Sequence, residues 1–349
     1  MSKFKQTIFI VLFVCGIVLP VPLWMVVAPF FEKEGTENRT LAEKPVLSAE
    51  SYTEYAEEYE AYFNDHLPFR EELIGVESMT DFLLFKSSSD RVIAGKDGWL
   101  FYAAKNDGEP VKNYTGEDLL SKSQLKSIAE KLTKIDEYMK SRGGRFILFI
   151  APNKERVYSE YMPDKYGTPA EKSAVTQLID YLHENTDVEV VYCLDELMAA
   201  KESCADPLYY KTDTHWNQLG GYVGSRALMS ALDVDLPGLG DGAEYEVTGQ
   251  DGGDLAKYLH LEWMFAKADN EYEVKAYAGV QDERKIYLHV DSFYGAMLEY
   301  VNACFENREA VHFRNFVMKD MLEYEPDIFI YESVERYLPQ LVFLDTEGL

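Results

Sequence analysis

The stretch Ile286-Tyr287-Leu288-His289-Val290-Asp291-Ser292-Phe293 places a serine directly after a short apolar strand. Apolar side chains then recur at helical spacing, at Phe293, Met297, Val301 and Phe305. We therefore expect a strand over residues 286–290, a turn that carries Ser292, and a helix after it. A strand followed by an amphipathic helix is the building unit of an α/β sheet.

The same unit recurs along the chain. A helical stripe over Asp118–Ser141 stops at Gly143-Gly144 and leads into a continuous apolar strand, Arg145–Ala151. A second stripe covers residues 174–182, and strand-like runs follow at 188–193 and 327–332. This alternation predicts a largely parallel sheet with helices on both faces. Sites in such sheets lie outside the carboxyl ends of the strands, where Ser292 is expected.

Two segments outside this pattern also carry predictions. Val92–Tyr102 holds two short β-prone runs around Gly95-Lys96-Asp97-Gly98, which indicates a hairpin. Residues 236–254 are rich in Gly and Asp and predict a loop.

A carboxylate and an imidazole stand two residues apart in Asp213-Thr214-His215, just before a predicted helix. An imidazole can take a proton from a serine hydroxyl and return it to a leaving group. A carboxylate on the other ring nitrogen fixes the tautomer and stabilises the imidazolium. The hypothesis is therefore Ser292 as nucleophile, His215 as base and Asp213 as orienting group. The alternative is that Asp213 caps the following helix and His215 is a surface residue.

Acyl chemistry also needs donors for the oxyanion. Ser292 is expected at a helix N-terminus, where free backbone N–H groups can supply one. Asn153 or Lys154, at the end of the strand from Arg145, is a candidate second donor; the alternative is a helix or loop cap. Trp216 either lines a sugar groove or belongs to the core.

Composition excludes several classes of function. The net charge of −27 argues against nucleic acid as a partner, because phosphates need basic surfaces. No cofactor is expected, since no phosphate-binding glycine loop is present. A metal hydrolase is disfavoured because Asp213 and His215 have no third ligand nearby in sequence. Cys193 and Cys204 could close a disulfide in an oxidising compartment; unpaired buried thiols are the alternative.

The N-terminus has its own pattern. Lys3 and Lys5 precede an uncharged run, residues 7–29, that would span roughly 35 Å as a helix. Pro20 and Pro22 would kink this helix, which membranes tolerate. We expect a transmembrane anchor with residues 1–6 in the cytoplasm and the rest extracytoplasmic. A cleaved signal peptide is the alternative. Residues 30–90 then form a linker with juxtamembrane helices, and residues 91–349 form the main domain.

With these residues described, the chain resembles the DHHW family, relatives of the alginate O-acetyltransferases with an SGNH-hydrolase-like domain. The resemblance rests on short motifs in the family's order: Glu37-Asn38-Arg39, Phe63–Arg70, Gly95–Tyr102, Ala151-Pro152-Asn153-Lys154, Asp213–Trp216, Gly253-Asp254-Leu255-Ala256, Asp291-Ser292-Phe293 and Glu335-Arg336. It implies a flavodoxin-like three-layer α/β/α domain with a Ser-His-Asp triad. In this branch the motif order is permuted, so that Asp213 and His215 precede Ser292.

The resemblance also implies an activity. Such proteins look like acetyltransferases that modify cell-surface or secreted polysaccharides, beside a multi-span membrane O-acyltransferase that supplies the acyl group. Thr214 stands in the signature as in the alginate enzymes. Asp291 departs from the family's pattern. A carboxylate beside the nucleophile would oppose the negative charge of an oxyanion unless it points elsewhere. An extracytoplasmic carbohydrate esterase and a non-catalytic polysaccharide-binding subunit of an acyltransferase complex stay open as alternatives.

Overall fold

The computed structural model describes residues 3–27, 41–48, 52–84, 86–240, 242–275 and 282–349. The chain forms two compact units, Met1–Leu84 and Phe85–Leu349. The first contains four helices among its described residues: α1 (Lys3–Val18), α2 (Pro20–Val27), α3 (Tyr55–Asp65) and α4 (Arg70–Leu83). The second contains the sheets and the predicted site.

The segment predicted as one kinked helix over residues 7–29 forms two helices within its described residues, 7–27. Helix α1 ends at Val18 and α2 begins at Pro20, with Leu19 between them. Proline has no N–H to donate and its ring clashes with the carbonyl four residues back, so it ends one helix and suits the first position of the next. Within the described ranges, no helix is both long enough and apolar enough to cross a membrane.

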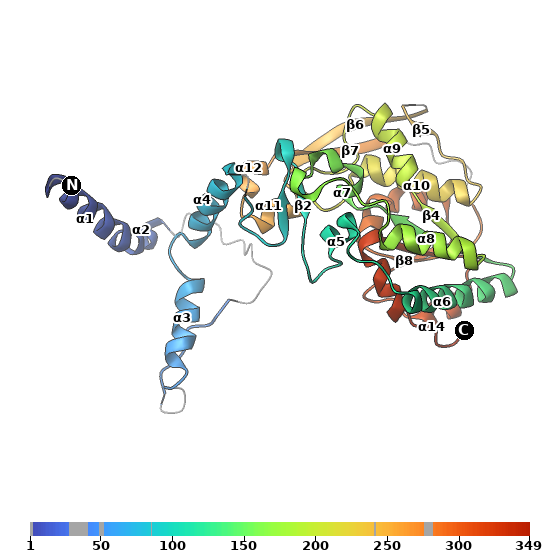
Figure 1. Ribbon diagram of the computed structural model, residues 1–349, viewed down its shortest axis with the longest axis horizontal. Helices are drawn as coiled ribbons and strands as arrows, with labels where there is room; N and C mark the ends of the chain where they lie inside the picture. Colours follow the sequence, from blue (N-terminus) through green and yellow to red (C-terminus); the bar gives the residue numbers. More distant parts are fainter. Residues whose placement is uncertain (1–2, 28–40, 49–51, 85, 241, 276–281) are drawn as a thin grey trace. The chain divides into compact units, whose positions relative to one another are not determined.

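A five-stranded sheet forms the centre of the second unit (Figure 1). Its strands lie in the spatial order β4 (Glu189–Tyr192), β3 (Arg145–Ala151), β10 (Ile328–Val334), β8 (Ile286–Val290) and β9 (Arg308–His312). Every neighbouring pair is parallel. The parallel α/β sheet predicted from the sequence is therefore confirmed.

The strand order also accounts for the permuted motifs. If counting starts at β8 and runs through β9 and β10 before returning to β3 and β4, the spatial order is 2-1-3-4-5. That is the flavodoxin-like order. In this chain the strand that precedes Ser292 is first by topology but comes late in the sequence, after Asp213 and His215.

Helices cover both faces of the sheet and make three layers. On β3 alternate side chains point to opposite faces. Phe146, Leu148 and Ile150 pack with residues of α6 (Lys122–Ser141), α8 (Ala174–Asn185) and α14 (Met318–Tyr324). Ile147 and Phe149 pack with residues of α9 (Leu194–Ser203), α10 (Gln218–Ala231) and α13 (Leu298–Cys304). A strand covered on both sides is apolar throughout, as the sequence of β3 shows.

Smaller elements surround the sheet. The predicted hairpin is confirmed: β1 (Val92–Ala94) pairs antiparallel with β2 (Leu100–Tyr102). The predicted loop over 236–254 is largely wrong, because β6 (Gly242–Asp251) pairs with β7 (Asp269–Lys275) and with β5 (Gly238–Leu239). The short helices are α5 (Pro110–Thr115), α7 (Lys154–Val157), α11 (Asp254–Tyr258) and α12 (Glu262–Phe265). The 3-10 helices are η2 (Lys96–Gly98), η3 (Ser159–Tyr161), η4 (Asp164–Tyr166), η5 (Ser292–Ala296) and η6 (Glu335–Phe343).

Cys193 and Cys204 are both unpaired. They lie at opposite ends of α9, as its N-cap and C-cap residues. A ten-residue helix is about 15 Å long, well beyond the Cα separation that a disulfide bridges.

Candidate active site

Ser292, His215 and Asp213 form one hydrogen-bonded line. The His215 Nε2 atom lies 2.8 Å from the Ser292 hydroxyl oxygen, and His215 Nδ1 lies 2.6 Å from Asp213 Oδ1. With the Nδ1 proton on the carboxylate side, Nε2 is free to accept the serine proton. The structure therefore brings the three predicted residues together in the order that proton transfer requires.

The turn after β8 presents Ser292. Asp291 is buried, and its Oδ1 accepts the Phe293 N–H at 2.8 Å while its Oδ2 accepts the Val334 N–H at 2.7 Å. Both carboxylate oxygens thus bind backbone donors rather than face the serine hydroxyl. Ser292 is exposed and is the first residue of η5, a position whose N–H has no partner within the helix. That N–H is available to an oxyanion.

Behind this turn lies a second buried carboxyl group. Glu332 Oε2 accepts the Asp291 N–H at 2.7 Å. Burial, followed by the negative charge of Asp291, raises the pKa of Glu332 well above its usual range. Glu332 is therefore held in its neutral form more readily than an exposed glutamate, which limits the negative charge behind Ser292.

Buried polar contacts fix the loop that carries Asp213 and His215. Lys154 Nζ donates to the backbone carbonyl oxygens of Tyr210 at 3.1 Å, Lys211 at 3.2 Å and Asp213 at 2.5 Å. On the other side of the loop, Asp269 accepts hydrogen bonds from the Lys211 N–H and from the N–H and hydroxyl of Thr212. The Lys154 ammonium group and the Asp269 carboxylate therefore fix the loop. The sequence did not predict either contact.

The segment Gly253–Ala256 lies directly against Asp213. The Asp254 N–H donates to Asp213 Oδ2 at 2.9 Å, and the Gly253 N–H donates to the Thr212 hydroxyl at 2.8 Å. A Cβ on Gly253 would come within 2.4 Å of the Asp213 Cβ, so only glycine permits this approach. The motif Gly253-Asp254-Leu255-Ala256 could be recognised in the sequence. Its contact with Asp213 could not, because the two lie 40 residues apart.

The electrostatics of the site follow from these contacts. Burial would raise the pKa of Asp213, but the hydrogen bond and charge of His215 and the Asp254 N–H together hold it well below its usual range. The pKa of Asp254 is raised, first by burial and then by the nearby Asp213 carboxylate. Asp213 is thus kept ionised beside the imidazole, as an orienting carboxylate must be.

Asp254 also offers the third possible ligand, a carboxylate oxygen, that the sequence lacked near Asp213 and His215. Ligand atoms of the three residues lie within 4.8 Å of one another. The oxygens and ring nitrogens already have protein partners, since Asp254 accepts the Thr214 N–H and hydroxyl, each at 2.9 Å, and His215 bridges Asp213 and Ser292. We therefore interpret the group as a hydrogen-bonded network rather than a metal centre.

An open cavity of about 430 Å³ lies in front of Ser292. It is lined by Tyr210, Asp213, His215, Trp216, Gln218, Phe293, Gly295, Ala296, Glu299 and Tyr300 together with the serine. Trp216 is 1% exposed and its Nε1 donates to the Phe293 carbonyl at 2.8 Å, so it is chiefly a core residue that also borders the cavity.

The two candidate oxyanion donors do not line this cavity. Asn153 is buried, and its amide group contacts Asn113, Glu335 and Arg336. It occupies the N-cap position of α7, but its side chain makes no cap hydrogen bond there. Lys154 faces the loop carbonyls described above. Both residues lie in the turn after β3, which other segments of the chain bury. They therefore contact the segments around the site and do not reach its cavity.

Comparison with known proteins defines the family. The family model described as "SGNH hydrolase-like domain, acetyltransferase AlgX" matches residues 92–287, more than half of the chain. The chain belongs to this family of SGNH-hydrolase-like domains, which confirms the resemblance described from its motifs.

The relatives are distant. A probable alginate O-acetylase AlgJ of Pseudomonas syringae pv. tomato is 25% identical over 273 residues, 76% of this chain and 63% of that protein. The Pseudomonas putida protein of the same name is 27% identical over 213 residues, 59% of this chain and 52% of that protein. The chain thus spans from about half to just under two-thirds of the length of these curated relatives.

The chain is also similar to proteins of known structure. The O-acetyltransferase domain of Pseudomonas putida AlgJ is 22% identical, with 73% of this chain and 96% of that chain covered and a TM-score of 0.49. A DHHW family protein from Eubacterium siraeum is 14% identical, with 61% and 85% covered and a TM-score of 0.47.

Proposed function

We propose that this protein is an extracytoplasmic O-acetyltransferase that moves an acetyl group through acetyl-Ser292 to hydroxyl groups of a cell-surface or secreted polysaccharide. The observation that carries the proposal is the hydrogen-bonded line from Ser292 through His215 to Asp213, which opens on a cavity. Membership of the AlgX-like family and the names of the AlgJ relatives support transfer of acetyl groups to a polymer.

The reaction has two halves. In the first, Ser292 Oγ attacks the carbonyl carbon of an acetyl donor and passes its proton to His215 Nε2. The tetrahedral oxyanion binds the Ser292 N–H, and its collapse expels the leaving group, which takes the proton from His215. In the second half, a sugar hydroxyl gives its proton to His215 and attacks acetyl-Ser292. Collapse of that intermediate releases the acetylated sugar and returns the proton to Ser292.

Two other functions share parts of this site. An esterase would use the same three residues with water as the acceptor, and the cavity in front of Ser292 is open. A non-catalytic binding subunit would need neither half-reaction. The sequence motivated that second alternative through Asp291, but the Asp291 carboxylate binds the Phe293 and Val334 N–H groups instead of facing the serine.

Intact-protein mass distinguishes the three functions. The full chain would be exposed to an activated acetyl ester, with and without a panel of oligosaccharides. We expect an added acetyl mass that one sugar discharges faster than water does, and no adduct in Ser292→Ala. Ser203→Ala, which removes an exposed hydroxyl of α9, is the control that should acetylate normally. Discharge by water alone would indicate the esterase, and no adduct on folded protein would indicate the binding subunit.

We further propose that a multi-span membrane O-acyltransferase supplies the acyl group and that the apolar N-terminal segment holds the domain at the membrane. The uncharged run over residues 7–29 after Lys3 and Lys5 supports membrane attachment with the N-terminus in the cytoplasm. Alkaline extraction of membranes tests it: the full chain should stay in the pellet and a chain without residues 1–29 should not. Release of both would contradict the anchor and leave the acyl-transfer proposal untouched.

A further inference from the structure

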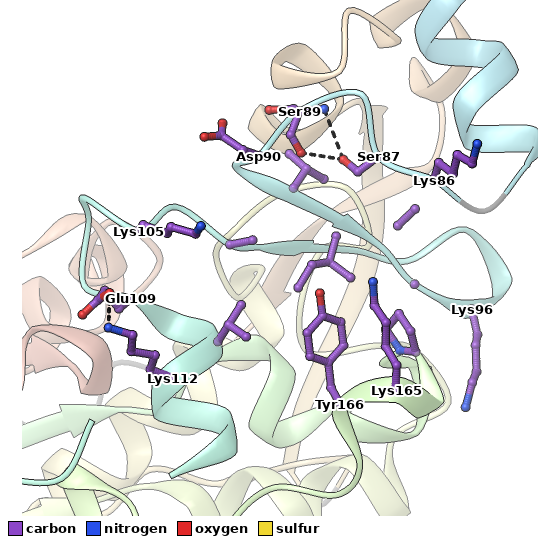
Figure 2. A pocket seen from close by; sticks show the side chains of 17 residues that line it. Lys86, Ser87, Ser89, Asp90, Lys96, Lys105, Glu109, Lys112, Lys165 and Tyr166 are labelled. Atoms are coloured by element: carbon purple, nitrogen blue, oxygen red, sulfur yellow. Dashed lines mark hydrogen bonds and ion pairs between the residues drawn. The ribbon is translucent and has the colours of Figure 1, made fainter. Parts of the chain in front are cut away.

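A second and larger cavity lies beneath the β1–β2 hairpin (Figure 2). Its volume is about 1090 Å³, slightly above the usual range for ligand pockets. Four segments line it: residues 86–90 before the hairpin, the hairpin itself, residues 103–112 after it, and residues 163–166. The described residues that line this cavity are all different from those that line the cavity in front of Ser292.

The charge of this cavity is opposite to that of the chain. Acidic residues outnumber basic ones 61 to 34 in the whole sequence. The cavity lining contains two acidic residues, Asp90 and Glu109, but five lysines: Lys86, Lys96, Lys105, Lys112 and Lys165. A cluster of cations in so acidic a protein creates a local positive potential that attracts anions. We name this feature the lysine cleft.

Some of these lysines already have anionic partners. Lys112 pairs with Glu109 at 2.7 Å, and Lys96 pairs with Asp164 at 2.6 Å. Within the described ranges, no carboxylate pairs with Lys86, Lys105 or Lys165. Lys165 Nζ lies 4.9 Å from the centre of the Tyr166 ring, and Figure 2 shows both side chains extending toward the hairpin. The Asp90 carboxylate points away from the cavity in the same view.

The walls between the lysines are apolar. Val92 and Ile93 of β1 are buried, and Ala94, Ala103 and Val111 complete the lining around Tyr166. A ligand that suits this surface combines separated negative charges with an apolar or carbohydrate face. Among the described residues, no arginine lines the cleft. Arginine is favoured where a planar group is bound in a bidentate fork, whereas lysine binds phosphate as a point charge.

We propose that the lysine cleft binds a phosphorylated glycan or polyol, with the phosphates on Lys105 and Lys165 and the carbon skeleton on the wall formed by β1 and Tyr166. This site is separate from the acyl-transfer site and does not depend on the proposed reaction. One backbone hydrogen bond joins the hairpin to the loop that carries Asp213: the Leu100 N–H of β2 donates to the Lys211 carbonyl at 2.8 Å.

The experiment compares three probes on the full chain in detergent micelles: a short glycerol-phosphate oligomer, tetragalacturonate, and an uncharged tetrasaccharide. We expect the phosphate oligomer to bind most tightly, with an affinity that falls as salt screens the lysines. Lys105→Gln combined with Lys165→Gln should weaken it about tenfold, because two ion pairs between the phosphates and exposed lysines are lost. The control combines Lys122→Gln with Lys267→Gln, which makes the same change in net charge at exposed sites outside the cleft. It should leave the affinity for the phosphate oligomer unchanged.

Each outcome decides the proposal. Equal binding by wild type and the Lys105/Lys165 variant, or no binding of the phosphate oligomer, would overturn the site. Tighter binding of tetragalacturonate would overturn the phosphate assignment in favour of a carboxylated polymer. Acylation of Ser292 by an activated ester should be equal in all variants. A failure of that acylation in wild type would concern the proposed function and not the lysine cleft.

Discussion

The turns after β8 and after β3 have the same position in the fold and opposite surroundings. Both strands pair in parallel with β10, so both turns lie at one edge of the sheet. After β8, Asp291 caps its own turn and Ser292 is exposed. After β3, residues 152–158 are all buried, and Asn153 contacts α5 and the start of η6 rather than its own helix. The position at the end of a strand places both turns at the same edge of the sheet. Whether a side chain there is exposed depends on the segments that pack over the turn.

This difference separates two kinds of effect. Substitutions around the exposed turn should lower the rate of Ser292 acylation and change the free energy of unfolding little. Substitutions in the buried turn should mainly lower the free energy of unfolding. They should affect acylation only indirectly, through the loop over residues 210–213 that Lys154 contacts.

The largest effect is expected for His215→Gln. Glutamine cannot act as a general base at neutral pH, so acylation of Ser292 should fall about 10³-fold. The His215 side chain is 28% exposed, and the free energy of unfolding should change by no more than about 1 kcal/mol. Burst kinetics with an activated ester and urea unfolding measure the two quantities. His183→Gln on the surface of α8 is the control, and equal rates in both variants would contradict the role of His215.

Lys154→Met addresses the buried turn. It leaves three carbonyl oxygens of the loop over residues 210–213 without their ammonium donor. Burial lowers the pKa of Lys154 to about 8, so methionine also relieves some desolvation. We expect a net loss of about 3 kcal/mol in the free energy of unfolding, because buried acceptors that lose their partner are costly. Urea unfolding against Lys122→Met checks this; equal stability would show that the loop is held without the ammonium group.

Glu155→Gln tests the same turn through the pH dependence of the free energy of unfolding. Burial raises the pKa of Glu155 from 4.5 to about 7, while the unfolded chain keeps the ordinary value. Between these values the folded state binds more protons, so wild-type stability falls as pH rises from 4.5 through 7. The variant has no such proton. Its stability relative to wild type should therefore increase by about 3 kcal/mol between pH 4 and pH 8.

Urea unfolding at several pH values measures that difference. Glu184→Gln, an exposed change on α8, should run parallel to wild type at every pH. A Glu155→Gln curve that also runs parallel would mean that the carboxyl group has the same pKa in the folded and unfolded states, which would contradict the raised pKa of Glu155.

The residues around Ser292 were predictable because their signals are local. An apolar strand followed by a serine, and an Asp-x-His pair before a helix, can each be recognised within a few positions. The support for these residues was not predictable in the same way. Gly253 and Asp254 act on Asp213 across 40 residues of chain, and nothing in their neighbourhood indicates that contact.

The errors in the fold have similar causes. The strand β6 contains Gly242, Gly249 and several acidic residues, which favour a loop by composition. Pairing with β7 over most of its length overrides that preference. The N-terminal segment was predicted as one helix kinked at its prolines, but the structure divides it into two helices before Pro20. Local preference was therefore reliable except where a distant partner or a single backbone constraint opposed it.

Asn153→Ala gives the smallest expected effect and the sharpest test of the comparison. The variant removes the amide that contacts Glu335 and Arg336, and it should lower the free energy of unfolding by about 1 kcal/mol. Acylation of Ser292 should stay within about twofold of wild type, because Asn153 does not line the cavity and so cannot donate to an oxyanion there. The matched control is Asn185→Ala at the end of α8, whose amide donates only to its own helix. If acylation fell more than about tenfold at unchanged stability, Asn153 would be an oxyanion donor and the buried turn would belong to the chemistry after all.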